Sequence, residues 1–431
     1  MTFIRKNKDY ILDGLQIALL FLLGFKFLNL QLVFSIILFI FLLVRYFFQN
    51  RLVGIKKQAK YELFDLIVLF VFLTTTPIIK SYFDRGNIFS NFFHFSFLPL
   101  MFWLSVRTLS SDIKLNGCTS IVSYFVGCFF FICFCKGYTF AQFGLKSNVR
   151  MFYDIWTKED ISSTIASLYL LPIFLMCISL FVYFVSKKKT SLFSIIFIIP
   201  ILVCLYISIR LSNRGFFVAG LISIYFLAYV LFFLFDTRKS TKNIYILYGL
   251  LGVSVVMLGF ALTIAFNLFG FKDKLMGIPF FYRFLTGGTD SLRSQIYREF
   301  FANALHYPMG GLLQSGVIKS GKYVHNSIFD LYGLTGILPT LCFLYFIIRF
   351  MIFCSFKKTY SKNILFSLIF LTLFYGALSI SFFEPTISAN GYYFAAFFAF
   401  FSIVSRDTKL FKKPEIKKLS EEKKSESQTS N

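Results

Sequence analysis

Long apolar stretches alternate with short polar segments along nearly the whole chain. Twelve of them come near the roughly 20 apolar residues that a helix needs to cross the hydrocarbon core of a membrane. Their cores cover residues 11–28, 32–48, 63–79, 91–106, 118–135, 164–185, 191–209, 215–235, 244–266, 327–353, 363–381 and 391–405. The pattern predicts an all-α, polytopic integral membrane protein whose transmembrane helices, about 12 of them, form one domain over residues 1–405. The first stretch, Ile11–Leu30, lacks a small-residue cleavage site and leads directly into another span, so we expect a retained helix rather than a removed signal.

Basic residues recur in every second polar segment, counted from the N-terminus. They are Arg5, Lys6, Lys8, Arg51, Lys56, Lys57, Lys60, Arg107, Lys114, Lys187, Lys188, Lys189, Arg238, Lys239, Lys242, Lys357, Lys358 and Lys362, followed by the lysines of the tail. An excess of Lys and Arg is typical of cytoplasmic loops. We therefore predict that both termini are cytoplasmic and that segments 136–163, 267–326 and 382–390 lie outside. The tail, residues 406–431, is basic and poor in hydrophobic residues, which predicts a disordered cytoplasmic segment.

The composition agrees with a membrane protein and argues against other classes. Hydrophobic residues make up 57% of the chain and charged residues 15%, and the mean hydropathy is +0.72. A net charge of +24 would suggest nucleic-acid binding in a soluble protein, but here most of it sorts to one side of the membrane, so we predict no nucleic-acid partner. The eight cysteines lie in or beside apolar segments without metal-ligand spacing, so neither a disulfide framework nor a zinc site is predicted.

The longest polar segment, the external loop 267–326 between the ninth and tenth predicted spans, is the first candidate for chemistry. Its residues up to 325 include seven basic and three acidic side chains. An arginine fork can grip two phosphate oxygens and stays protonated at any working pH, so a basic external loop favours an anionic ligand at the membrane surface. Long loops are also exported regardless of charge, so the loop charge alone is compatible with no ligand.

Two arginines, Arg210 and Arg214, bracket a Ser-Asn turn at the predicted outer end of the seventh span, in ISIRLSNRGFFVAG. An arginine at a membrane boundary either extends its head group to the interface or meets an anion. The positive-inside rule explains arginines in cytoplasmic loops but not two arginines at the outer end of a helix. Their position therefore favours anion binding over simple extension to the interface.

A histidine, His325, precedes the tenth predicted span. Histidine has an ordinary pKa of about 6.5 and can act as a general base near neutrality, although a capping or surface role is the alternative. If the helix starts near Asn326, then Phe329, Gly333 and Gly336 form one thin stripe that another helix or a lipid chain could approach.

Three motifs in order resemble the O-antigen ligase and polymerase superfamily. They are LSNRG (211–215) at a helix end, RSQIYREFFANALHYPMGG (293–311) in the external loop, and HNSIFDLYGLTGIL (325–338) at the entry to the next helix. Members of that family are bacterial membrane glycosyltransferases that use sugars carried on undecaprenyl diphosphate. The resemblance covers residues 200–345 in motif and the whole chain in number of spans.

The resemblance implies roles for particular residues. Arg214 and Arg293 would hold the lipid diphosphate, with Arg298 and Arg283 as alternatives to Arg293, and His325 would act on the acceptor. Further candidates are Arg210 and Arg298 for the diphosphate, and Asn326, Asp330 and His306 for the substrate. No acidic metal cage is visible in the sequence, so we expect a metal-independent enzyme without a cofactor.

The favoured function is a polymerase that joins lipid-linked repeat units into capsule or O-antigen polysaccharide at the outer face of the bacterial cytoplasmic (inner) membrane. A ligase that moves a finished glycan to another acceptor remains an alternative, as do a lipid-oligosaccharide flippase and a non-catalytic assembly protein. Against a flippase, the chain shows no related halves, and its acidic residues cluster at span ends or in loops. The expected partners are undecaprenyl-diphosphate-linked oligosaccharide and membrane lipids, and flippase and chain-length regulator proteins are further candidates.

Overall fold

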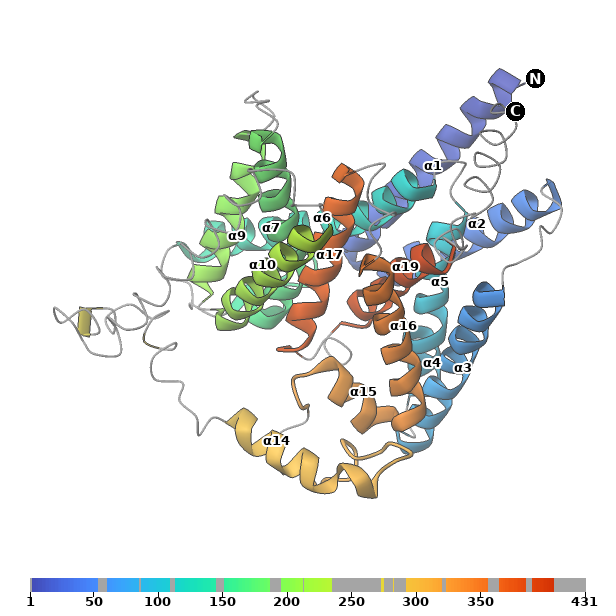
Figure 1. Ribbon diagram of the computed structural model, residues 1–431. Helices are drawn as coiled ribbons and strands as arrows, with labels where there is room; N and C mark the ends of the chain where they lie inside the picture. The colour runs from blue at the N-terminus through green and yellow to red at the C-terminus, as the bar shows by residue number, and fades with distance from the viewer. Residues whose placement is uncertain are drawn as a thin grey trace, which may run out of the picture.

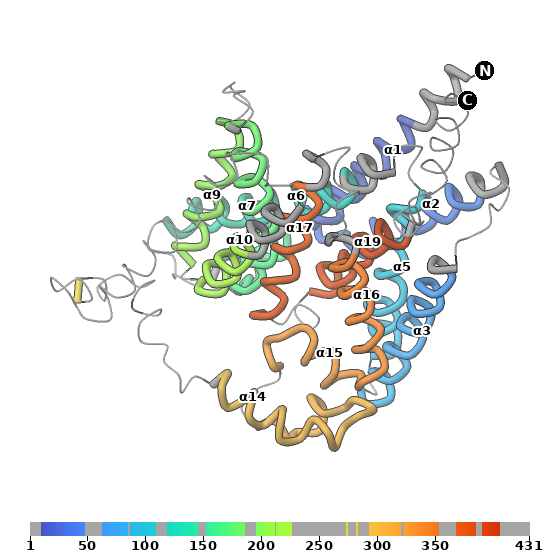
Figure 2. The backbone as a smooth tube through the Cα atoms, viewed as in Figure 1, coloured from blue at the N-terminus to red at the C-terminus, as the bar shows by residue number. Residues whose placement is uncertain are grey.

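The computed structural model of the protein describes most of the predicted spans and parts of the external loop. The described residues are 2–52, 60–84, 87–108, 113–144, 151–186, 195–211, 213–234, 273–274, 282, 292–319, 323–355, 364–384 and 390–406. Nearly all of these residues are helical (Figures 1 and 2). The predicted all-α class is confirmed for this part of the chain.

The helices follow the predicted spans closely. They are α1 Thr2–Gly24, α2 Gln31–Leu52, α3 Lys60–Phe83, α4 Ile88–Phe92, α5 Leu98–Arg107, α6 Ile113–Phe143, α7 Ser163–Ser186, α9 Ile198–Arg210, α10 Arg214–Leu234, α14 Leu292–Asn303, α15 Ser327–Thr335, α16 Ile337–Ser355, α17 Ile364–Ser381 and α19 Gly391–Arg406. Short 3-10 turns cover Phe27–Asn29 and Ala304–His306, and a π-helical turn joins α4 to α5. One element departs from the prediction: Met151–Tyr153 (β1) and Asp160–Ser162 (β2) form a small antiparallel hairpin.

Four of the described helical segments are long and apolar enough to cross a membrane. They are Leu63–Phe83, Ile88–Arg107, Thr119–Phe143 and Ser163–Val185, and seven shorter apolar helices accompany them. The chain is therefore a helical membrane protein. The predicted span 244–266 lies outside the described residues, and so does the predicted disordered tail 406–431 except Arg406, which is the last residue of α19. The total of twelve spans and their orientation therefore stay predictions.

The tenth predicted span is not one continuous helix, and the prediction was wrong at this point. The helix breaks at Gly336, whose φ of +80° separates α15 from α16. A Cβ at Gly336 would collide with the carbonyl of Pro308, and a Cβ at Gly333 would lie 2.7 Å from the side chain of Leu313. The predicted thin face therefore packs against the external loop instead of a helix or a lipid. With nine residues, α15 is roughly 14 Å long, too short to cross the membrane.

Several helix pairs pack at short range because small residues face a neighbouring backbone, as is common in membrane bundles. Gly24 of α1 and Gly127 of α6 each face the backbone of the other helix, and Gly376 of α17 lies against Pro172 of α7. Figure 1 shows α17 between the group α7, α9 and α10 and the group α15 and α16. The C-terminal end of α17 therefore lies between these two groups of helices, and the candidate site described below is centred on the turn that follows it.

The predicted external segments meet at one end of the bundle. The α9–α10 turn is tied to the start of α7 by the Asn213 amide, which donates to the carbonyl of Ser163 at 2.6 Å. The external loop is tied to the end of α17 through Arg293, which donates to the carbonyl of Phe383 at 3.1 Å. Segments predicted to lie on one side of the membrane are thus joined to each other.

Candidate functional site

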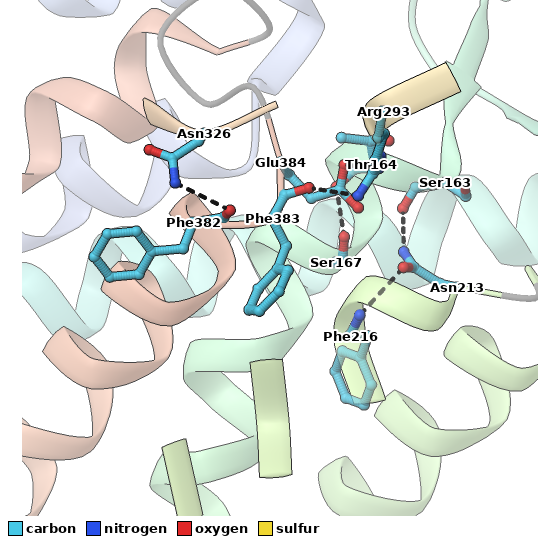
Figure 3. A network of polar contacts seen from close by, with 10 residues as sticks. All are labelled: Ser163, Thr164, Ser167, Asn213, Phe216, Arg293, Asn326, Phe382, Phe383 and Glu384. Carbon is cyan, nitrogen blue, oxygen red and sulfur yellow. Dashed lines mark hydrogen bonds and ion pairs between the residues drawn. The ribbon is translucent and has the colours of Figure 1, made fainter. Parts of the chain in front are cut away.

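The turn after α17, residues 382–384, is the centre of the candidate site (Figure 3). Helix ends leave carbonyl groups without partners inside the helix, and they carry the negative end of the helix dipole. Here the carbonyl of Phe382 accepts a hydrogen bond from the Asn326 amide at 3.4 Å, and that of Phe383 accepts one from Arg293. The turn therefore links the external loop to the start of α15.

Arg293 lies near the start of α14 and makes two contacts through its guanidinium group. One nitrogen, Nη1, donates to the carbonyl of Phe383, and the other, Nη2, lies 3.4 Å from Oε2 of Glu384. The Arg293 side chain is 44% exposed, whereas that of Glu384 is 5% exposed. The arginine is thus oriented by buried acceptors while part of its surface stays open. A guanidinium has five N–H groups, so donors remain for an anion.

The LSNRG motif builds the neighbouring wall of the site. Asn213 caps α10, because its Oδ1 accepts the backbone N–H of Phe216 at 3.2 Å. Arg214 is the first residue of α10 and is partly exposed. A Cβ at Gly215 would lie only 2.6 Å from Oε1 of Glu384, so the glycine allows the carboxylate to approach the start of the helix. The motif therefore brings Arg214 next to the turn that orients Arg293.

Glu384 is a residue that the sequence analysis missed. It is buried against the starts of α7 and α10, where the Thr164 hydroxyl also hydrogen-bonds to it. Burial raises the pKa of Glu384, and the opposing effects are the charge of Arg293 and the hydrogen bond from Thr164. A single acidic residue in the predicted external segment 382–390 was the only sequence signal.

His325 lies directly before α15 in a constrained loop. Its φ is +62°, a left-handed conformation that is uncommon for residues other than glycine. Asn326 caps the following helix, with its Oδ1 accepting the backbone N–H groups of Ile328 and Phe329. Asp330 accepts the backbone N–H of Val324 at 2.7 Å. The residues on both sides of His325 are therefore held in place.

The imidazole of His325 is partly buried, and its surroundings determine its charge state. Its Nδ1 is buried and has no hydrogen-bond partner among the described residues. Burial, and then the positive charge of Arg293, lower the pKa of His325 to about 4. The ring is therefore neutral at neutral pH. Arg293 and Asn326, the residue after His325, bind neighbouring carbonyl groups of the turn after α17, those of Phe383 and Phe382.

Aromatic packing brings α14 and α15 together. The ring of Phe329 lies 5.3 Å from that of Phe300 and 6.1 Å from that of Tyr297, measured between centroids. The Tyr332 hydroxyl donates to the carbonyl of Ala304 at 2.7 Å. This packing fixes the helix that carries Arg293 against the helix that follows His325.

Four predicted site residues lie elsewhere or play a different part in the structure. Arg298 is exposed on α14, and His306 is exposed beyond the end of that helix. Arg210 lines a separate cavity between α6 and α9. Asp330 is fully buried, and its contact with Val324 favours a structural role over the predicted substrate contact. Arg283, the remaining alternative, lies outside the described residues.

In comparisons with known proteins, no family model and no curated protein matches the chain. Within the described ranges, no three His, Cys, Asp or Glu side chains gather as a metal site would require.

Proposed function

We propose that the protein is a membrane glycosyltransferase that polymerises undecaprenyl-diphosphate-linked oligosaccharide repeat units at the outer face of the bacterial cytoplasmic membrane. The product would be capsule or O-antigen polysaccharide. The observation that carries this proposal is the meeting of the three resembling motifs around residues 382–384, where Gly215 lies against Glu384, Arg293 binds the carbonyl of Phe383, and Asn326 binds that of Phe382.

In this reaction the acceptor sugar hydroxyl attacks the anomeric carbon of the donor. The bond from that carbon to the diphosphate oxygen breaks, and undecaprenyl diphosphate leaves with the electron pair. Arg293 and Arg214 would stabilise the negative charge that develops on the leaving group, as fixed cations do at other transition states. His325 would accept the proton of the attacking hydroxyl.

Glu384 gives Arg293 a partner that a diphosphate must replace or share. The arginine is oriented before the ligand arrives, since one edge is bound to the turn after α17 and the rest is open. Because the Arg293 side chain is already ordered, ligand binding has a smaller entropic cost. The single long contact between Arg293 and Glu384 also leaves the guanidinium able to bind a diphosphate, which carries more negative charge.

A gene deletion with plasmid rescue tests the proposal. Lipid-linked single repeats should accumulate in the deletion strain, and gels of surface glycan should show the polymer missing. His325→Ala, Arg293→Ala and Arg214→Lys should fail to restore it. Arg214→Lys keeps the charge but removes the two-pronged grip on phosphate.

The control for this experiment is Gln295→Ala, which changes an exposed residue of α14 whose amide donates to Glu299 of the same helix. It should restore the polymer. Arg298→Ala tests which of the two arginines of α14 binds the diphosphate. We expect this variant to restore the polymer, because Arg293 and not Arg298 contacts the turn after α17. Accumulation of full-length lipid-linked polymer would instead identify a ligase, and full rescue by all three site variants would refute the assigned site.

A further inference from the structure

Three large apolar side chains are exposed in the external loop, near the end of α14 and just after it. Phe301 is 58% exposed, Leu305 88% and Met309 67%. Single exposed hydrophobic residues are common on protein surfaces, but several that lie close together mark a surface that meets a membrane or another protein. The segment 301–309 therefore has the composition of a binding surface.

The predicted outer ends of two apolar helices fix the position of this segment relative to the membrane. The backbone N–H of Ile337, the first residue of α16, donates to the carbonyl of Pro308 at 2.9 Å. A Cβ at Gly311 would lie 2.5 Å from the ring of Phe83, the last residue of α3, and α3 is long and apolar enough to cross a membrane. In Figure 1, α14 lies across the lower end of the bundle, and the chain that follows it turns at the lower end of α3. Met309 lies in this turn, so it is level with the end of a membrane span.

The surface next to this turn is the lipid-facing surface of the bundle. On α16, the side chains of Ile337, Leu338 and Leu341 are about half exposed, and exposed apolar side chains of a membrane-spanning helix face hydrocarbon. At the end of α3, Tyr82 is largely exposed, and tyrosine is enriched where a helix leaves the hydrocarbon core. The exposed side chains of the segment 301–309 therefore continue the apolar surface that α16 presents to lipid.

Helix α14 has a polar side that does not include these apolar residues. Gln295, Glu299 and Asn303 follow one another at four-residue spacing, which places them on one side of the helix, and hydrogen bonds join them along it. Phe301 lies away from this side, and the exposed Arg298 precedes it by three residues. Arg298 can therefore reach lipid phosphate groups while its aliphatic stem covers apolar surface. A polar side, exposed apolar residues and a basic residue are typical of helices that lie in the membrane interface.

We propose that the segment 301–309 inserts into the outer leaflet of the membrane and holds α14 along its surface. The partner is the lipid surface itself, with acyl chains around Phe301, Leu305 and Met309 and phosphate groups around Arg298. The inference goes beyond the proposed function and does not depend on it, because it uses only the exposure and the position of these side chains. Within the proposed function, the same anchor would hold Arg293 of α14 at the depth where a lipid-linked diphosphate meets water.

Photo-crosslinking of the full-length chain in nanodiscs of phosphatidylethanolamine and phosphatidylglycerol tests this inference. The photoreactive residue benzoylphenylalanine replaces Leu305 or Met309, and mass spectrometry after irradiation identifies what each probe has captured. Both probes should yield a phospholipid adduct, at a level similar to that of a probe in place of Leu341 on α16. The matched control is a probe in place of Gln295, an exposed residue on the polar side of the same helix, which should lose this adduct.

The outcomes separate this inference from the proposed function. A normal phospholipid adduct at Leu341 but none at Leu305 and Met309 would overturn the membrane anchor, and so would equal adducts at Leu305 and Gln295. A crosslinked dimer in place of the lipid adduct would overturn it by showing that a second copy of the chain covers this surface. Lipid adducts at both positions, together with full rescue of the polymer by all three site variants, would leave the anchor standing while the proposed site fails.

Discussion

Replacing Gly215 by alanine should inactivate the protein without removing any charge. A Cβ at this position would lie 2.6 Å from Oε1 of Glu384, whereas ordinary contacts begin near 3.4 Å, so the carboxylate must move by about 0.8 Å. Its contact with Arg293 is already 3.4 Å long, so a movement of this size away from the arginine would break it. The substitution therefore removes one of the two contacts that orient Arg293 and leaves only the bond to the carbonyl of Phe383.

The expected effects on stability and on activity differ in size. Arg293 is 44% exposed, so loss of its ion pair should cost at most about 1 kcal/mol. Alanine is favoured over glycine inside a helix by up to about 1 kcal/mol, and Gly215 lies within α10 without a positive φ. The free energy of unfolding should therefore change little. A misplacement near 1 Å can lower activity by on the order of 10²-fold.

The assay compares Gly215→Ala with Gly220→Ala, an identical substitution in the same helix. A Cβ at Gly220 would lie 3.4 Å from the Leu171 side chain, which is an ordinary contact. In the deletion strain, Gly220→Ala should restore the polymer and Gly215→Ala should not, at equal protein levels and similar Tm. Full polymer with Gly215→Ala, or an equal defect in both variants, would refute the role given to Glu384 and Arg293.

Three more predictions concern protons, the loop and metals. With three histidines in the chain, NMR titration of the labelled, ligand-free protein should find the pKa of His325 near 4, so that without a donor the imidazole stays neutral until the pH falls toward that value. Arg293→Gln should raise this pKa, since a nearby cation is removed, and an unchanged value would show that the two residues do not interact. Asp330→Ala leaves the buried Val324 N–H unpaired and should destabilise the fold by about 1–3 kcal/mol, measured as a lower Tm, whereas Asp330→Asn keeps an acceptor and should cost less. Chelators should not inhibit transfer by the purified protein, and strict dependence on added Mg²⁺ or Mn²⁺ would contradict the arginine mechanism.

The sequence predicted the helices well because one physical quantity decides them. A run of apolar residues long enough to cross the hydrocarbon core must be helical, since lipid offers no partners to the backbone. The break at Gly336 could not be predicted in this way, because its cause is the approach of Pro308 from the external loop. Local pattern fixes the segments, and long-range contact decides where a segment is interrupted.

The candidate site was predicted in part. The motifs named Arg293, His325 and Asn326, and the structure brings these three together. The motifs did not identify Glu384, because its part in the site comes from its burial against α7, α10 and α14 in the folded chain. They also grouped Arg210 with Arg214, although the turn between the two helices directs Arg210 to another cavity.

Buried charges within the helices bear on the transporter alternative. Asp13 of α1 pairs with Arg45 of α2, and Asp65 of α3 lies 3.5 Å from Arg349 of α16. The Tyr345 hydroxyl also donates to Asp65 at 2.5 Å. Ion-coupled carriers often use a carboxylate in mid-membrane that changes its charge state. Each of these carboxylates already has an arginine from another helix, which favours a role in joining helices.

The charges around Glu384 give a reason for a carboxylate beside the two arginines that we propose to bind phosphate. Without a ligand, Glu384 and the carbonyl of Phe383 hold Arg293 in one orientation. When a diphosphate binds to Arg293, its negative charge opposes both the ionised form of Glu384 and the effect of Arg293 on His325. The pKa of His325 should then rise from about 4 toward its ordinary value, which makes the imidazole a stronger base. The base would thus become effective only when a donor is present, which limits unproductive chemistry in its absence.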